Sequence, residues 1–193
     1  MQSGNPEGVI RLINAGAHPD EIRNEQGFCA LMMCLPGDVA HVASRLLKAG
    51  ANPNVPPPPS QDKTYLGHIL ECAGAGYSQP MLQAFLVAGA DPDMPLHVVE
   101  GPRPLHFAAS RALAGPAALL AAHGANPFER DEQGKTAIDH LLGLPDFQKA
   151  LLLGAIFPPP LSPDRLETLL ACLPQEEHEL LSWLEEAWGG PSS

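Results

Sequence analysis

The sequence predicts an all-α solenoid, a stack of repeated helix pairs that ends in a small helical cap. Three observations predict it. A Gly-Ala-Asx-Pro-like motif recurs along the chain, an apolar helical pattern precedes each copy, and a polar turn opens another helix upstream of most copies. Aromatic residues make up only 5% of the 193 residues, so the core must consist mainly of small and aliphatic side chains, which let helices pack closely.

The repeated motif occupies residues 15–20, 49–54, 88–93 and 123–127, with a fainter copy at 153–155. Its glycines, at positions 16, 50, 89, 124 and 154, are separated by 34, 39, 35 and 30 residues. Periods of roughly 20 to 50 residues are typical of repeat architectures. We expect each glycine to end a helix in the left-handed conformation, and the proline that follows most copies to prevent the helix from resuming.

The helix before each glycine is predicted from apolar residues that recur every three to four positions, which places them on one helical face. We expect these residues to be buried. They are Val9, Leu12 and Ile13; Val42, Leu46 and Leu47; Leu82, Phe85 and Leu86; Leu119 and Leu120; and Phe147, Ala150 and Leu151.

Another helix is predicted upstream in most units, and its best copy is Pro-Leu-His-Phe-Ala-Ala at residues 104–109. Related copies begin near Gly27, Thr64 and Gly134. The order of turn, Thr-Pro-Leu-His-like helix, second helix and Gly-Ala-Asx-Pro loop resembles the ankyrin repeat. The resemblance covers about residues 5–157. It implies helix pairs with projecting β-turn fingers, a concave face that binds proteins, and a His106 ring that bonds to the backbone of a neighbouring turn.

The predicted domains are ankyrin repeats over residues 1–157 and a C-terminal helical cap with a loose tail over 158–193. The repeats comprise a half repeat at 1–20 and about four further units. Ser162 followed by Pro163 is a good start for a cap helix. That helix would carry Leu166, Leu169, Leu170 and Leu173, and a second would run over 175–188. The alternative to a cap is a second contact surface anchored by Trp183 and Trp188, because tryptophans concentrate binding energy.

Three segments depart from the regular pattern. The second unit is followed by Val-Pro-Pro-Pro-Pro-Ser at residues 55–60, which is either a rigid extension of a finger or a polyproline ligand for an aromatic groove. The third unit is lengthened around residues 74–80, and the fifth is shortened at 143–146. Insertions in solenoids usually form surface loops, and terminal repeats are often atypical.

The chain has 22 acidic and 11 basic residues and a formal charge of -11. This balance argues against nucleic acid or an anionic membrane as a partner and suits a basic protein, although it also suits simple solubility. The four cysteines form no CxxC pair, so we expect buried thiols in a reducing compartment. No signal peptide or membrane span is evident, and we expect a cytoplasmic protein that is monomeric alone.

Catalytic motifs are not evident: there is no P-loop, HExxH, nucleophile elbow or dinucleotide fingerprint. The chain has eight histidines, and no two of them stand three or four positions apart, the spacing that would place them side by side on a helix. We therefore expect no enzyme activity, no cofactor and no metal.

Partner contacts are expected at the variable positions of the fingers and of the inner helices. The candidate residues are Glu25, Gln26, Phe28, Gln61, Lys63, Tyr65, Arg103, Arg111, Glu132, Gln133 and Lys135. We expect Phe28 and Tyr65 to face solvent, and Arg103 to forgo the local hydrogen bond of the usual threonine. The predicted function is a specific inhibitor or immunity-type (antitoxin) protein that grips one enzyme or toxin. The alternative is an adaptor or host-directed effector whose C-terminal helices bind a second protein. The 22 Pro, 18 Gly and four Lys weakly favour a GC-rich, bacterial source.

Overall fold

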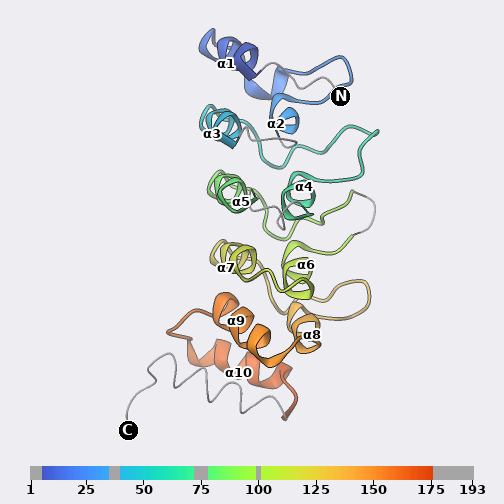
Figure 1. Ribbon diagram of the computed structural model, residues 1–193, viewed down its shortest axis with the longest axis vertical. Helices are drawn as coiled ribbons and strands as arrows, with labels where there is room; N and C mark the ends of the chain where they lie inside the picture. Colours follow the sequence, from blue (N-terminus) through green and yellow to red (C-terminus); the bar gives the residue numbers. More distant parts are fainter. Residues whose placement is uncertain (1–5, 35–39, 72–77, 99–100, 176–193) are drawn as a thin grey trace. The chain divides into compact units, whose positions relative to one another are not determined.

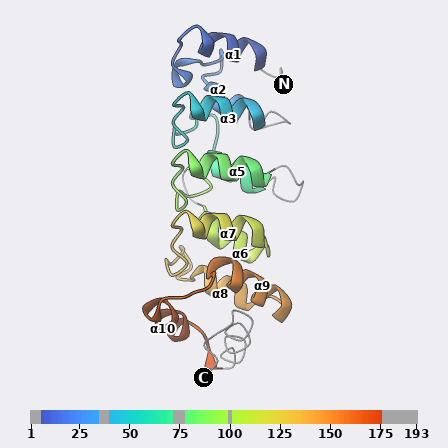
Figure 2. The ribbon, with the colours of Figure 1, turned by 90° about the vertical axis from the view of Figure 1, so that its left-hand side faces the viewer.

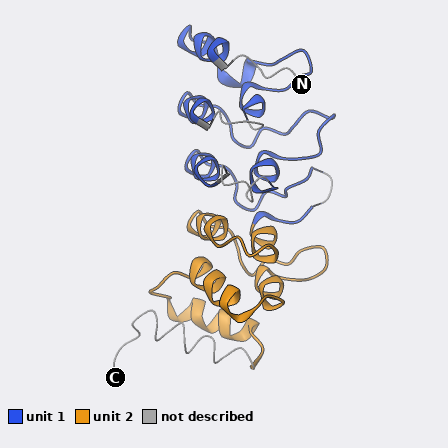
Figure 3. Ribbon diagram, viewed as in Figure 1, with its two compact units in different colours: residues 1–104 blue, residues 105–193 orange. Residues whose placement is uncertain are grey.

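The computed structural model describes residues 6–34, 40–71, 78–98 and 101–175. The chain divides into two compact units, residues 1–104 and 105–193, which are described one at a time (Figure 3). The secondary structure of the described residues is helical apart from two isolated β-bridges. In the same residues, no helix has the length and apolar character needed to cross a membrane.

The first unit is built from two rows of helices. One row consists of α1 (Pro6–Asn14), α3 (Ala40–Lys48) and α5 (Ser78–Val87), in which α3 packs against both of the others (Figures 1 and 2). The second row contains the shorter helices α2 (Ala30–Met33) and α4 (Tyr65–Glu71), which pack against α3 and α5 respectively. A 3-10 turn, η1 (Pro19–Glu21), lies between α1 and α2. The predicted helix pairs are thus present in this unit.

The second unit repeats this arrangement. It contains α6 (Pro104–Ser110, whose first residue ends the first unit), α7 (Ala114–Ala122), α8 (Ala137–Leu142) and α9 (Asp146–Ile156). The helices α7 and α9 pack together, and α8 packs against α9. The last described helix is α10 (Pro163–Cys172), which begins as expected: the Ser162 side chain accepts a hydrogen bond from Arg165 N.

Four of the five predicted helix ends are confirmed. Gly16, Gly50, Gly89 and Gly124 have φ angles between 91° and 96°, the left-handed region that glycine adopts without strain. The fifth prediction is wrong, because Gly154 lies inside α9, which continues to Ile156. At the fifth copy no Asx-Pro pair follows the glycine, so nothing prevents the helix from continuing.

The predicted core is correct in the central helices and partly wrong at the two ends. Leu46, Leu82 and Phe85 are fully buried, as expected. By contrast Leu12 is 49%, Phe147 78% and Leu151 51% exposed. In α9 the buried side is formed by Lys149, Ala150, Leu152, Leu153 and Ile156, so the helix is rotated relative to the prediction.

The predicted second cap helix at 175–188 and the tail after it lie almost wholly outside the described residues, as do Trp183 and Trp188. The proposed domain boundary after residue 157 stays a prediction. In α10, Leu169 is buried and Leu170 is exposed, and Leu173, directly after the helix, is buried.

Candidate functional site

The first finger (residues 22–30) is a short hairpin fixed by its backbone and one side chain. Ala30 N donates to Ile22 O at 2.8 Å, and Asn24 N donates to Phe28 O at 2.9 Å. The Oδ1 of Asn24 accepts from the backbone N–H groups of Gln26 and Phe28, at 3.0 and 2.9 Å. A side-chain amide that bonds backbone groups two and four residues ahead holds the turn in one conformation.

The fourth finger (residues 129–136) repeats this hairpin. Asp131 N donates to Lys135 O at 2.8 Å, and Asp131 Oδ1 accepts from Gln133 N and Lys135 N, both at 2.9 Å. The two turns have the sequences Arg-Asn-Glu-Gln-Gly, at 23–27, and Arg-Asp-Glu-Gln-Gly, at 130–134. In each turn the arginine Nη1 donates to the carbonyl of the glycine. Two distant segments therefore build the same rigid turn.

The tips of both hairpins expose the residues that the sequence analysis selected. Glu25, Gln26, Glu132 and Gln133 are exposed, and the bonds that fix each turn come from the backbone and from the neighbouring Arg and Asn or Asp. The Glu and Gln side chains are thus free of the hydrogen bonds that hold the turn, and available to a partner. Lys135, at the end of the fourth hairpin, is also exposed, whereas Phe28, its counterpart in the first, is half-buried.

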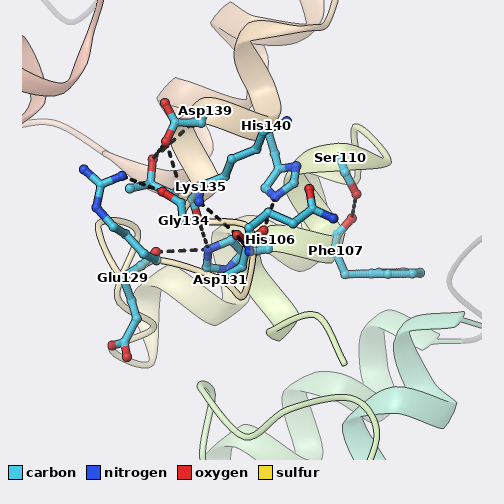
Figure 4. Close-up of polar contacts among 12 residues, drawn as sticks. His106, Phe107, Ser110, Glu129, Asp131, Gly134, Lys135, Asp139 and His140 are labelled. Atoms are coloured by element: carbon cyan, nitrogen blue, oxygen red, sulfur yellow. Dashed lines mark hydrogen bonds and ion pairs between the residues drawn. The ribbon is translucent and has the colours of Figure 1, made fainter. Parts of the chain in front are cut away.

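Two histidines fasten the fourth finger to the helices of the second unit (Figure 4). The Nε2–H of His106, on α6, donates to Glu129 O at 3.0 Å and Lys135 O at 3.1 Å, which confirms the expected contact with a neighbouring turn. His140, on α8, donates from Nε2 to Asp131 Oδ2 at 2.6 Å. The finger is thus held at its base and at its central carboxylate.

The electrostatics of this cluster follow from these contacts. Partial burial raises the pKa of Asp131, but the hydrogen bonds from His140, Lys135 N and Gln133 N outweigh it and bring the pKa to about 2. Burial lowers the pKa of His106, and the two carbonyl acceptors oppose this only partly. Because both acceptors require a proton on Nε2, the neutral ring carries none on Nδ1, which is buried with no hydrogen-bond partner among the described residues.

The second finger (residues 55–64) and the third finger (residues 94–98 and 101–103) pair with each other. Lys63 and His97 form an antiparallel β-bridge, flanked by Thr64 N→Leu96 O at 2.9 Å and Val98 N→Asp62 O at 2.7 Å. A bridge of this kind brings the side chains of its central pair onto one face.

The bridged pair carries a chain of charged contacts. His97 Nδ1 lies 2.8 Å from Asp62 Oδ2, and its Nε2 lies 3.3 Å from Glu71 Oε1, on α4. Lys63 also pairs with Glu71. Burial raises the pKa of Glu71, but Lys63 and His97 together leave it below its usual value. Lys63, predicted to contact a partner, is thus already engaged within the chain.

The expectation that Tyr65 faces solvent is wrong. Tyr65 is the first residue of α4 and is 2% exposed, with its ring 5.5 Å from that of Phe85. Its position is equivalent to the proline of the Thr-Pro-Leu-His pattern, one residue inside the helix and not in the turn before it. In this structure Tyr65 presents no surface to a partner.

The remaining predicted residues are scattered. Gln61 is half-buried, near the paired fingers. Arg103 is half-buried and donates from Nη1 to Asp93 O, ten residues before it, at 3.1 Å, so its guanidinium is already engaged within the chain. Arg111 is exposed, with its guanidinium 5.2 Å from the centre of the Phe107 ring.

One set of surface residues was missed by the sequence analysis. Each first helix presents a half-exposed side chain at the position after the His of the Thr-Pro-Leu-His pattern: Met33, His68, Phe107 and His140. The register of that pattern was the signal that could have identified them. Burial, followed by the nearby Lys63, lowers the pKa of His68.

The comparison with solved structures identifies the fold. The crystal structure of an ankyrin repeat domain from Acinetobacter baumannii AYE matches with a TM-score of 0.60 and 21% sequence identity, over 94% of this chain and 92% of that one. This chain has the ankyrin-repeat fold. The ankyrin repeat domain of Bcl-3, a member of the IkappaB family, is also similar, with a TM-score of 0.49 and 21% identity over 77% of each chain. No protein-family model and no curated protein matches the sequence.

The ankyrin-repeat fold confirms the predicted all-α class and the resemblance read from the repeats. Its fingers and first helices are the segments described above. Among the residues that the structure describes, no three His, Cys, Asp or Glu side chains converge as a metal site requires. Each unit therefore carries a candidate surface of its own, made of its exposed finger tip and its half-exposed first-helix residues.

Proposed function

We propose that this chain is a non-catalytic protein-binding module whose ankyrin fingers and first helices grip a partner protein. The observation that carries this proposal is the pair of identically bonded hairpins at the first and fourth fingers. Each is fixed by hydrogen bonds of its own, and each exposes a Glu-Gln pair at its tip. Surfaces that are rigid before binding lose little conformational entropy on binding, which favours affinity.

The partner that these tips fit is a basic protein. Glu25 and Glu132 occupy equivalent exposed positions, and the chain carries a formal charge of -11. Complementary charge speeds the encounter of two proteins and suppresses wrong partners. The half-exposed first-helix residues Met33 and Phe107 add apolar area of the kind that anchors an interface.

In its more specific form, the proposal is that the chain is an inhibitor or immunity-type protein that holds one enzyme or toxin. A fixed, acidic surface favours a single dedicated partner, because a promiscuous surface must repack for each protein that it binds. This form predicts a 1:1 complex in which the partner loses activity.

Charge reversal at the tips tests the proposal. The test variant is Glu25→Lys/Glu132→Lys, and the matched control is Glu7→Lys/Glu167→Lys, which reverses two exposed carboxylates on helices α1 and α10. Wild type and both variants are used as bait in a lysate of the source cells, and captured proteins are identified by mass spectrometry. Circular dichroism melting verifies that all three baits are folded.

The expected result is a protein captured by wild type and control and lost by the test variant. Capture of the same proteins, in the same amounts, by all three baits would overturn the role of the finger tips. The captured protein is then purified and its activity titrated with the chain. Activity that falls to zero at a 1:1 ratio supports the inhibitor form, and unchanged activity in a stoichiometric complex contradicts that form alone.

A further inference from the structure

The second finger begins with four consecutive prolines, Pro56–Pro59, whose backbone is largely fixed by covalent chemistry. Each proline ring holds φ near about -65°. A residue that precedes proline is pushed to extended ψ, and Val55, Pro56, Pro57 and Pro58 all precede one. This combination of angles is that of the polyproline II helix, which has about three residues per turn.

The polyproline segment is anchored at both ends. On its N-terminal side, Asn54 donates from Nδ2 to Gly89 O and accepts at Oδ1 from Asp91 N, both at 2.9 Å. On its C-terminal side, Gln61 N donates to Pro58 O at 2.8 Å, which closes a turn with Pro59 in the position that proline favours. The segment is therefore held in one conformation before any partner arrives.

The exposure of the four prolines follows the period of this helix. Pro56 and Pro59 are exposed, whereas Pro57 and Pro58 between them are half-buried. Positions three apart lie on the same side of a polyproline II helix, with a rise of about 3.1 Å per residue, so the two exposed rings stand about 9 Å apart on one face. The loop that carries them projects beyond α4, on the side away from α3 (Figure 1).

We propose that Pro56 and Pro59 form a proline ridge that docks into the aromatic-lined groove of a proline-recognising domain in a second protein. Such grooves take two prolines three positions apart and gain affinity because a polyproline helix is already ordered. The ridge fits this chemistry in its spacing, its exposure and its rigidity. The inference is independent of the finger tips, and it gives the chain a second partner beside the one that the tips hold.

The chain contains a natural comparison for the proline ridge. Pro158, Pro159 and Pro160 are also consecutive and exposed, and the exposed Pro163 stands three positions after Pro160. Pro163, however, is the first residue of the helix α10, so Pro160 and Pro163 do not lie on one polyproline II helix. If any exposed run of prolines sufficed, both segments would bind. If two exposed prolines must stand three positions apart on one polyproline II helix, only the ridge binds.

The test measures binding of the full chain to purified, 15N-labelled SH3, WW and EVH1 domains, one representative of each class, by NMR titration. Four proteins are compared: wild type, Pro56→Ala/Pro59→Ala, the milder single variant Pro56→Ala, and the control Pro158→Ala/Pro159→Ala. Circular dichroism melting establishes that each protein is folded before titration. If the double variant is unfolded, the single variant Pro56→Ala is used in its place.

The expected result is that at least one domain shows shift changes confined to its aromatic groove with the wild-type chain. Affinity should fall about tenfold or more in the double variant, by a smaller factor in the single variant, and stay unchanged in the control. Two outcomes would overturn the proposal. In one, no domain of any class responds to the wild-type chain at a concentration of about 1 mM, which would reveal even a dissociation constant in the millimolar range. In the other, the variants that lack Pro56 bind as tightly as wild type. Neither outcome bears on the finger tips, because Glu25 and Glu132 are unchanged in every protein used.

Discussion

The hydroxyl of Tyr65 lies 2.6 Å from the Sγ of Cys29, and both side chains are buried. Cys29 immediately precedes α2, and Tyr65 opens α4, so this one contact joins two successive helix pairs of the first unit. Burial raises the pKa of the Tyr65 hydroxyl well above its usual range, and the bond to Cys29 adds to the shift. Tyr65 is therefore a structural residue at the interface between repeats.

Substitutions at Tyr65 should act on stability alone. Tyr65→Phe keeps the ring and removes the hydroxyl, which should lower the free energy of unfolding by about 0.5–1.5 kcal/mol. Tyr65→Ala also removes the contact with Phe85 and should cost about 3–5 kcal/mol. Urea denaturation measures both. A Tyr65→Ala variant as stable as wild type would show that the ring is not part of the core.

The burial of Tyr65 could not be predicted from the local sequence pattern. The copy of the first-helix pattern at residues 64–67 reads Thr-Tyr-Leu-Gly, with two of four residues altered, so the pattern did not fix the boundary between turn and helix. In the structure, Thr64 Oγ1 accepts from Gly67 N at 3.2 Å, the bond of a helix-capping threonine. The residue after such a cap belongs to the first turn of the helix, and here it faces the preceding repeat.

Features decided by near neighbours were predictable. A helix end or start depends mainly on the capping residue and on its immediate neighbours. This is the case for the helix ends at Gly16 and Gly50 and for the start of α10 at Ser162. The side-chain hydrogen bond between Asp62 and His97 joins residues 35 positions apart, and no local sequence rule predicts it. The rotation of α9 likewise depends on packing against α7, which a pattern of apolar residues within α9 does not specify. The rigid finger tips were found because their register follows the repeat.

Leu105 should be a core residue whose loss is costly. It is 1% exposed on α6, and Leu105→Ala should lower the free energy of unfolding by about 2–4 kcal/mol, because it removes buried methyl groups and leaves a cavity. The matched control is Leu151→Ala, the same chemical change at an exposed position of α9, which should cost no more than about 0.5 kcal/mol. Equal losses in the two variants would contradict the burial of Leu105.

Gly67 should not tolerate even a methyl group. A Cβ built on Gly67 would lie 2.2 Å from the backbone carbonyl oxygen of Leu96, which cannot move aside as a side chain can. Gly67→Ala should therefore separate the third finger from α4 and cost about 1–3 kcal/mol or more.

Gly143 provides the control for Gly67. Its φ of -76° suits any residue, and the nearest atom to an added Cβ is 3.9 Å away. Gly143→Ala should be neutral or should stabilise by about 0.4–1 kcal/mol, through reduced entropy of the unfolded chain. Urea denaturation of Gly67→Ala and Gly143→Ala in parallel measures both changes in stability. Similar changes at the two sites would contradict the close contact between Gly67 and the Leu96 carbonyl oxygen.

His106 should make the stability of the second unit depend on pH. Burial holds its pKa below the ordinary value of 6.5, so the folded state prefers the neutral ring. Its contribution is complete above that value and is lost as the pH falls below it, because the unfolded state takes up the proton first. The wild-type chain should therefore lose stability between pH 8 and pH 5, a window above the range in which Asp131, with a pKa of about 2, titrates.

The variant His106→Gln isolates this contribution. At pH 7 it should cost only about 0.5–1.5 kcal/mol, because the glutamine NH2 group still supplies a donor to the carbonyls of Glu129 and Lys135. Between pH 8 and pH 5, however, it should lose less stability than wild type does, because the titrating ring is gone. His68, in the first unit, is another histidine whose pKa is lowered by burial, and His68→Gln therefore serves as the control. Urea denaturation measures the stability of each variant at pH 8 and pH 5. If His106→Gln loses as much stability between these pH values as wild type does, the buried neutral ring of His106 does not cause the pH dependence.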